Sequence, residues 1–297
     1  MGGGSMSTMK NPKLAYIILV AFSILSILDL TSTIPKLLSV RSDHHTRNFH
    51  TTTATRCEVY PSSPADIHRN HFKSQSGEDA ELMKWFGGIC YGSYIEMGGL
   101  DGILFSNSRV FNRKFGWRGV LIEIIPSNFN KMVANRPNEI ANIHAGVCNS
   151  PRTLHYFDNP PTIELGEKHA GAVSGIYEFA SPAFRERWWH NATLEDMQEI
   201  ECDTLDNLLR KNVPKHTFFD FFSLDVEGAE LSVLESTDFD RVGFGVIFVE
   251  TDQHNDLKNL AIRALLEEAG YFYLRNVSRS EWYLNRQFHS IYNDLIY

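Results

Sequence analysis

The chain has 297 residues, 43% of them hydrophobic, which is enough to bury one substantial core. Its formal net charge is -8 at pH 7, and the sequence contains no basic run interleaved with aromatic residues. This balance argues against nucleic acid as a partner or substrate and suits neutral or cationic small molecules better.

The N-terminal region has the features of a membrane anchor. An uncharged apolar run over residues 14–28 follows Lys10 and Lys13. A span needs about 20 residues, and the run approaches that length if it extends to residue 34. The preceding lysines and the lack of a clear cleavage site predict a cytosolic tail (1–13) and a transmembrane signal anchor (14–34). We therefore expect a single-pass type II membrane protein of the Golgi or ER with a lumenal catalytic domain. Secretion after signal cleavage is the alternative.

A polar segment separates this anchor from the rest of the chain. Residues 35–71 are rich in Ser, Thr, His and Pro and show no hydrophobic period. They predict a flexible stem, followed by one catalytic domain over residues 72–297. Sequons at Asn191 and Asn276 would be open to glycosylation in a lumenal compartment.

The four cysteines show no C-x-x-C spacing that would indicate zinc or redox chemistry. In an oxidising compartment we expect Cys148 and Cys202 to pair, because each lies beside a predicted strand. Cys57 falls in the expected stem, and Cys90 lies just before the first strand. Buried unpaired thiols are the alternative.

Strand-like and helix-like segments alternate through the domain. The strand-like segments are 94–97, 120–124, 140–147, 218–226, 245–251 and 271–277, and the helical ones are 106–115, 127–135, 204–211, 229–236 and 257–269. This alternation predicts an α/β fold, a mostly parallel sheet with helices on both faces. Residues 282–284 would close it as a terminal hairpin. Residues 150–198 break the alternation and are expected to form an insertion that covers the active site.

A glycine-rich turn and a distant carboxylate outline a ligand-binding edge. An apolar strand enters a turn containing Gly98, Gly99 and Gly102, where the missing Cβ lets the backbone approach a ligand. About 20 residues later a second strand ends in Glu123, the spacing that brings an acid to a ribose diol. The glycines do not fit a pyrophosphate cradle, and Glu96 would suit cationic S-adenosylmethionine better than NAD. An ordinary turn beside a solvated strand end is the alternative.

These segments and two others make the sequence resemble the FkbM-type methyltransferase family. The matching motifs are SQSGED (74–79), IEMGGLDG (95–102) with SNS (106–108), GWRGVLIE (116–123) and LDVEGAEL (224–231). The resemblance covers roughly residues 72–285 and implies a Rossmann-like fold, S-adenosylmethionine as cofactor and methyl transfer to oxygen. Gly99 and Leu100 depart from the family's commoner Ala-Asn pair. The expected cofactor-binding residues are Glu96, Gly98, Gly99, Asp101, Gly102, Asn107 and Glu123.

The later strands also end in acidic residues, and such strand ends are where ligands collect in open α/β sheets. Asp225 and Glu227 follow the fourth strand, and His254 lies beyond the fifth. Because methyl transfer to a hydroxyl needs alignment and a base, these three residues are the catalytic candidates. Glu227 could instead stabilise a helix N-terminus, and His254 could be simply solvated.

Metal and carbohydrate contacts are secondary hypotheses. We expect no metal, although oxygen ligands from Asp225, Asp252 and Asn255 would suit magnesium. The paired Trp188 and Trp189 could stack on a sugar or could seal the insertion against the sheet.

The leading hypothesis is an S-adenosylmethionine-dependent O-methyltransferase that acts on a glycan or another hydroxylated substrate in the secretory pathway. The glycan follows from the expected location and not from a motif. One alternative is a catalytically inactive, membrane-tethered trafficking or adaptor protein with the same fold, although Glu96, Glu123 and Asp225 argue against it. A glycosyltransferase would want a D-x-D motif, which the sequence lacks. The sequence leaves the oligomeric state open.

Overall fold

The computed structural model of the chain describes residues 52–58, 69–159, 170–190, 192–251 and 255–296. The chain divides into two units, residues 1–48 and residues 49–297, and the described residues all belong to the second. The expected cytosolic tail, the expected transmembrane helix and most of the expected stem therefore lie outside the described residues. Among the residues that are described, no helix is long and apolar enough to cross a membrane.

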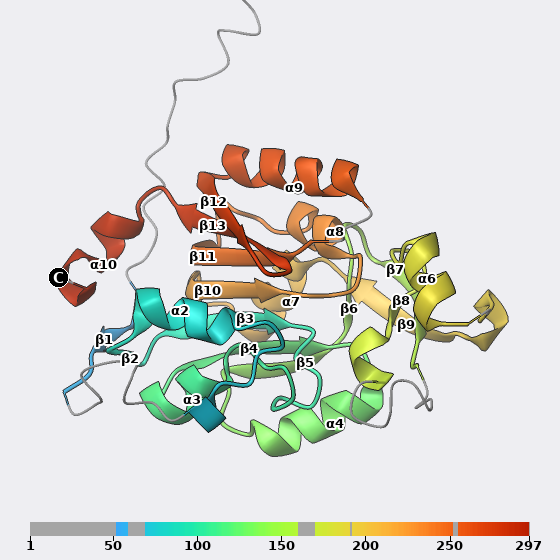
Figure 1. Cartoon of the computed structure of the whole chain (residues 1–297), viewed down its shortest axis with the longest axis horizontal. Helices are drawn as coiled ribbons and strands as arrows, with labels where there is room; N and C mark the ends of the chain where they lie inside the picture. Colours follow the sequence, from blue (N-terminus) through green and yellow to red (C-terminus); the bar gives the residue numbers. More distant parts are fainter. Residues whose placement is uncertain (1–51, 59–68, 160–169, 191, 252–254, 297) are drawn as a thin grey trace, which may run out of the picture. The chain divides into compact units, whose positions relative to one another are not determined.

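A seven-stranded mixed sheet forms the centre of the domain (Figure 1). In spatial order its strands are β12 (Tyr271–Val277), β13 (Ser280–Asn285), β11 (Gly243–Glu250), β10 (Phe218–Leu224), β3 (Ser93–Met97), β4 (Arg118–Glu123) and β5 (Ala141–His144). Neighbours from β11 to β5 pair in parallel, whereas β13 is antiparallel to both β11 and β12. The structure thus confirms the α/β fold and the terminal hairpin, and the hairpin makes the sheet mixed.

The order of the strands places a crevice at the centre of the sheet. After β3, the strands β4 and β5 are added on one side of it. The chain then crosses to the other side of β3, where β10 pairs with it. All residues of β10 and β11 are buried, which is typical of parallel strands covered on both faces. Ligands in such sheets bind beyond the carboxyl ends of the strands at this switch point.

Helices cover both faces of the sheet. One core cluster includes side chains of α7 (Leu205–Asn212), α8 (Glu230–Glu235) and α9 (Asp256–Glu268), and the other includes side chains of α2 (Glu78–Phe86), α3 (Arg109–Phe115), α4 (Pro126–Asn135) and α10 (Phe288–Ile296). In Figure 1, α2 crosses in front of the sheet and α7 and α8 lie behind it. Leu205, Leu208 and Leu209 show the apolar spacing that buries one face of α7.

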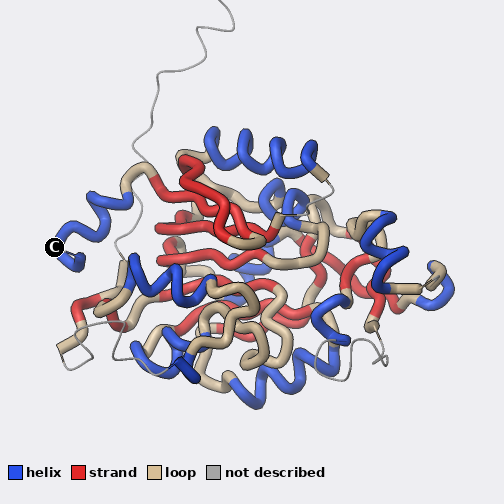
Figure 2. Tube along the Cα trace, in the orientation of Figure 1, coloured by secondary structure: helices blue, strands red, loops and turns tan. Residues whose placement is uncertain are grey.

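The insertion builds a second sheet of four strands, seen to the right of the large one in Figure 2. Its order is β6 (Gly146–Val147), β9 (Gln198–Asp203), β7 (Arg152–Phe157) and β8 (Gly175–Ile176), with α6 (Pro182–Trp188) and the short 3-10 helices η3 (Ala170–Val173) and η4 (Leu194–Asp196) between strands. The single strand expected over residues 140–147 is therefore wrong. The segment forms β5 in the large sheet and β6 in the small one, because the chain leaves the large sheet at Ala145.

The expected stem overlaps the folded domain. β1 (Thr55–Arg56) pairs with β2 (Ile89–Cys90), and Cys57 forms a disulfide with Cys90. The short 3-10 helix η2 (Arg69–His71) also precedes the expected start of the domain. The assignment of Cys57 to a flexible stem was therefore wrong, because a two-residue strand has no sequence period to reveal it. The second predicted pair, Cys148 with Cys202, is confirmed.

A buried carboxylate ties this N-terminal segment to the amino-end half of the large sheet. Asp220 on β10 is fully buried, and its oxygens accept hydrogen bonds from Thr52 Oγ1, Ser93 N and Tyr292 Oη, each at 2.7 Å. Burial raises the pKa of Asp220, and these three donors oppose the rise. Because these partners all belong to the chain, Asp220 stabilises the folded structure.

Candidate functional site

A pocket of about 1120 Å³, measured to its open mouth, lies at the carboxyl ends of the parallel strands. The ends of β3, β4, β10 and β11 contribute Gly98, Glu123, Asp225 and Glu250 to its lining. Residues of η3, of β8 and between them line it as well, among them Ala172, Ser174 and Ile176. This position supports the expectation that the insertion covers the site.

Gly98 brings the two central strand ends together. Its φ is +78°, and a Cβ at this position would lie 1.9 Å from the carbonyl oxygen of Asp225. No side chain fits into that space without moving the backbone. Gly98 thus lets the turn after β3 pack directly against the residue that follows β10.

Glu123 holds the position expected of a ribose-binding acid at the end of β4. Its side chain is buried, with Oε2 accepting from Leu100 N at 2.9 Å and Oε1 from Ile125 N at 2.8 Å. Burial raises the pKa of Glu123 to about 7, against the effect of these backbone hydrogen bonds. Each oxygen retains a lone pair that could accept from a ligand hydroxyl.

Leu100, one of the departures from the family pattern, has a left-handed backbone conformation. Its φ is +47°, in the left-handed region that asparagine tolerates better than leucine. The strained backbone directs Leu100 N toward Glu123. The turn therefore places leucine in a conformation that suits asparagine better.

Glu96 positions a loop of the chain. Its Oε1 accepts from Asn107 N at 2.6 Å, and its Oε2 accepts from Ser106 Oγ at 3.0 Å and from Ser108 Oγ. Burial raises the pKa of Glu96, while the charge of Arg136 and these hydrogen bonds oppose the rise. Glu96 does line the pocket, but its carboxylate already has partners in the chain. A direct contact with a cationic ligand, as the sequence suggested, is therefore not its main role.

Asn107 offers the pocket a free acceptor. Its Nδ2 donates to Ser223 Oγ at 2.9 Å, whereas its Oδ1 is buried and has no hydrogen-bond partner among the described residues. The residue is only 8% exposed and lines the pocket. Because a buried acceptor without a partner is costly, a ligand N–H or O–H group would be stabilised there.

Arg136 supports this loop from behind. It donates to Ser106 Oγ at 3.2 Å and to Ser108 Oγ at 2.8 Å, and it pairs with Glu139 at 2.7 Å. The two serine hydroxyls thus connect the buried guanidinium to the Glu96 carboxylate. Glu139 is close to Arg136 in the chain, but Ser106 and Ser108 lie 30 and 28 residues before it, so the sequence does not indicate this network.

Three of the expected cofactor-binding residues shape the turn and do not line the pocket. Asp101 Oδ1 accepts from Ile103 N at 2.8 Å and from Leu104 N at 2.7 Å. Gly102 has φ +76° and packs against Arg136, and Gly99 contacts Met132. The prediction that Gly99, Asp101 and Gly102 contact the cofactor is therefore not supported, because their neighbours are parts of the chain.

Three carboxylates meet on the β10 and β11 side of the pocket. Oxygens of Asp225, Glu227 and Glu250 all lie within 4.8 Å of one another. Asp225 and Glu250 share a hydrogen bond, and Arg279 forms an ion pair with Glu250. Burial raises the pKa of all three acids, and the charge of Asp225 adds to the rise at the other two. This acid cluster can accept a proton, attract a cationic group or hold a divalent cation by oxygen ligands.

The structure brings only some of the predicted catalytic and metal-binding residues together. Asp225 and Glu227 lie in the acid cluster, whereas Asp252 and His254 fall outside the described residues. Asn255 caps α9 by accepting from Lys258 N at 3.2 Å. The magnesium trio of Asp225, Asp252 and Asn255 stays a prediction, because Asp252 lies outside the described residues.

Glu230 has a structural role at the start of α8. Its Oε1 accepts from Gly228 N at 3.1 Å and its Oε2 from Lys258 Nζ at 2.6 Å. Glu250 is one of the strand-end acids in the sequence but was not among the three catalytic candidates, and Arg279 was not expected in the site. Glu250 ends β11 as Glu123 ends β4, so its signal was present. Arg279 lies in the turn of a hairpin and had none.

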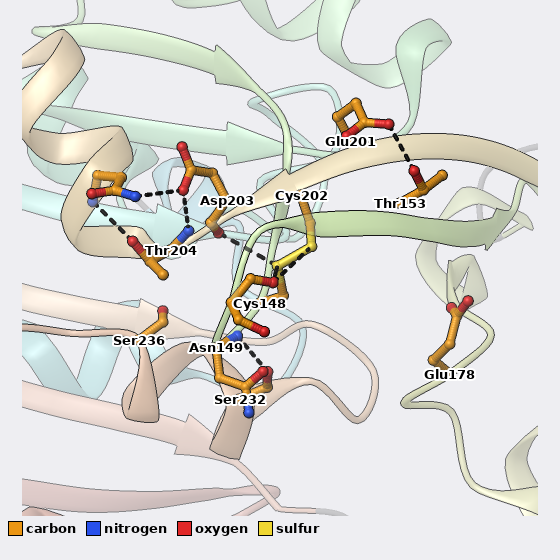
Figure 3. Close-up of a disulfide and its surroundings, with 12 residues drawn as sticks. Cys148, Asn149, Thr153, Glu178, Glu201, Cys202, Asp203, Thr204, Ser232 and Ser236 are labelled. Carbon is orange, nitrogen blue, oxygen red and sulfur yellow. Dashed lines mark hydrogen bonds between the residues drawn. A yellow bond between two sulfur atoms is a disulfide. The ribbon is translucent and has the colours of Figure 1, made fainter.

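The insertion is fixed in place over the pocket. Trp189 is buried and donates from Nε1 to Val173 O at 2.7 Å, so it packs inside the insertion and is not a surface platform for sugars. Figure 3 shows the Cys148–Cys202 disulfide at the base of the insertion. Beside it the backbone N–H of Asn149 donates to Ser232 on α8 at 3.1 Å.

The solved structures that are similar to this chain include two methyltransferases. The FkbM methyltransferase of Methylobacillus flagellatus KT has 13% sequence identity and a TM-score of 0.37, with 65% of this chain and 43% of that chain covered. A SAM dependent methyltransferase from Aquifex aeolicus has 12% identity and a TM-score of 0.33, with 75% and 97% covered. The chain thus spans less than half the length of the Methylobacillus protein. No curated protein matches the sequence.

The family assignment rests on the sequence model of the methyltransferase FkbM domain. That model matches residues 96–273, which is more than half of the chain. The match begins at Glu96 and includes the ends of β3, β4, β10 and β11, which line the pocket. The chain therefore belongs to the FkbM methyltransferase domain family, whose fold and membership imply S-adenosylmethionine as cofactor.

Proposed function

We propose that this protein is an S-adenosylmethionine-dependent O-methyltransferase that acts on a hydroxyl group of a glycan or a similar substrate. The observation that carries the proposal is the unpartnered Oδ1 of Asn107, buried in the same pocket as Glu123. Asn107 Oδ1 can accept from the ammonium of the cofactor, and the Glu123 carboxylate can accept from its two ribose hydroxyls. These are the main donor groups of S-adenosylmethionine. When bound, S-adenosylmethionine supplies an electrophilic methyl group on a cationic sulfur.

The acid cluster supports an acceptor that must lose a proton. Asp225 in its ionised form would take the proton of the acceptor hydroxyl, while Glu250 retains the proton that the pair shares. Arg279 limits the repulsion between the three acids by its ion pair with Glu250. The rigid insertion would exclude water and align the acceptor with the cluster.

Calorimetric titration of the full chain with S-adenosylmethionine and S-adenosylhomocysteine tests the proposal. Both ligands should bind, and Asn107→Leu should weaken binding about tenfold by removing the free acceptor. Ser223→Ala is the matched control, because it removes only the internal hydrogen bond of Asn107. Binding of neither ligand would reject the proposal and favour the adaptor alternative.

We further propose that the domain resides in the lumen of the Golgi or ER, on a single N-terminal span. Two disulfides support an oxidising compartment, and the sequon at Asn276 lies on an exposed part of β12. Protease added to sealed vesicles should leave the domain intact and remove only the N-terminal tail. Degradation of the whole domain would show the opposite orientation.

A further inference from the structure

A second pocket lies between η2 and α3 and is strongly basic. It measures about 620 Å³ to its open mouth, and its lining includes His71, Lys73, Arg109, Arg113 and Lys114. Arg109 and Arg113 are one helical turn apart on α3, so they project from the same face. Lys73 lines the same pocket from the segment after η2. Its backbone N–H donates to Asp79 Oδ2 at 2.6 Å.

The pocket concentrates positive charge in a chain whose net charge is -8. Lys73, Arg113 and Lys114 form no ion pair within the part of the chain that the structure describes. Burial lowers the pKa of Arg109, and the nearby charges of Arg136 and Arg113 lower it further. Asp101 opposes that effect, but its Oδ1 also accepts two backbone hydrogen bonds.

We infer that this basic pocket binds a tetrahedral oxyanion, phosphate or sulfate, either free or as an ester. Cations that converge from two segments can contact several oxygens of one group, and arginine forks match such oxygens in pairs. A planar carboxylate would leave part of this donor set unused. The site is separate from the methyltransferase pocket and does not depend on the proposed function. A bound oxyanion reduces the electrostatic repulsion between the cationic side chains that line the pocket.

Calorimetric titration of the full chain with inorganic phosphate, inorganic sulfate and glucose 6-phosphate tests this site. Lys73→Ala with Arg113→Ala removes two exposed cations and should weaken oxyanion binding at least about tenfold. Lys211→Ala with Lys215→Ala is the matched control, since it removes the same charge from two exposed side chains elsewhere. Stronger binding of the ester would identify an esterified ligand, and equal binding would identify the free anion.

Three results would overturn the inference. The first is a lack of saturable binding by all three probes. The second is an equal loss of affinity in both double variants, which would reveal a general charge effect. The third is binding to vesicles containing phosphatidylserine without binding of any soluble oxyanion, which would make the surface a membrane contact. An unchanged melting transition in both variants would show that the fold is intact.

Discussion

β10 carries one aspartate within it and a second immediately after it, and the two have opposite surroundings. The carboxylate of Asp220 accepts hydrogen bonds from three donors within the chain, which gives it a structural role. Asp225 lies among two other carboxylates, with Arg279 as the nearby counter-charge. Burial raises the pKa of both residues. A raised pKa alone therefore does not separate a structural acid from a functional one, and the partners of the acid do. Asp220 is fully buried among its donors, whereas Asp225 is half-buried and lines the pocket.

The largest expected effect tests the amino-end region that contains Asp220. Cys57→Ser with Cys90→Ser should lower the free energy of unfolding by about 3 to 4 kcal/mol, because the unfolded chain regains the freedom of a 33-residue loop. Turnover of the folded protein should not change. Chemical denaturation combined with activity assays measures both quantities. Cys148→Ser with Cys202→Ser is the comparison, since it should also reduce turnover by loosening the insertion.

The second prediction tests the carboxyl-end region. Asp225→Asn should reduce turnover about a hundredfold or more, while cofactor affinity and melting temperature remain nearly unchanged. The substitution keeps the shape of the side chain and removes the charge that accepts a proton. Single-turnover kinetics with calorimetry separates the two effects. Full activity in this variant would show that Asp225 is not the base.

The third prediction concerns Glu123. Glu123→Ala should weaken cofactor binding about ten- to hundredfold by removing two charge-assisted hydrogen bonds. In the native protein, affinity should fall as pH drops through about 7, because the protonated carboxyl is the weaker acceptor. Titrations across that range measure the change, and Glu123→Gln should lose the pH dependence. Unchanged affinity in Glu123→Ala would remove the residue from the ribose site.

The same pKa predicts an opposite trend in the stability of the free protein. The pKa of Glu123 rises from 4.5 to about 7 on folding, so the folded state favours the neutral carboxyl. Its contribution to stability is therefore complete below pH 4.5 and is lost as pH rises through about 7. Thermal denaturation of the free protein should show a weaker pH dependence for Glu123→Gln than for the native chain in this window. Parallel curves for the two proteins would contradict this assignment.

The smallest expected effect completes the comparison of the two aspartates. Asp220→Asn should lower stability by about 1 to 3 kcal/mol without changing turnover, because its amide NH₂ would face hydrogen-bond donors. Tyr292→Phe removes only one of those donors and should cost less. Denaturant titration with an activity assay provides the measurement. A large loss of turnover in Asp220→Asn would mean that the two ends of β10 are coupled.

The elements that the sequence predicts best are those with local signals. Apolar runs predicted β10 and β11, and strand-end acids predicted Glu123 and Asp225 as parts of the site. The role of Arg136 could not be predicted, because its partners Ser106 and Ser108 are distant in the chain. Arg279 could not be predicted either, because its contact with Glu250 depends on a hairpin turn. Asp101 was misassigned because an acid in a glycine turn can serve either a ligand or its own backbone, and only the fold decides.

The Cys57–Cys90 bond also determines how a mechanical load would enter this domain. Tension applied upstream of Cys57 passes through the disulfide to Cys90, which lies just before β3 in the central sheet. The covalent shortcut bypasses the segment that carries Gln75, Ser76 and Glu78, all of which line the pocket. A force applied to the chain before Cys57 would therefore act on the sheet and not on the segment that lines the pocket. After reduction of the disulfide, the same force would act through that segment.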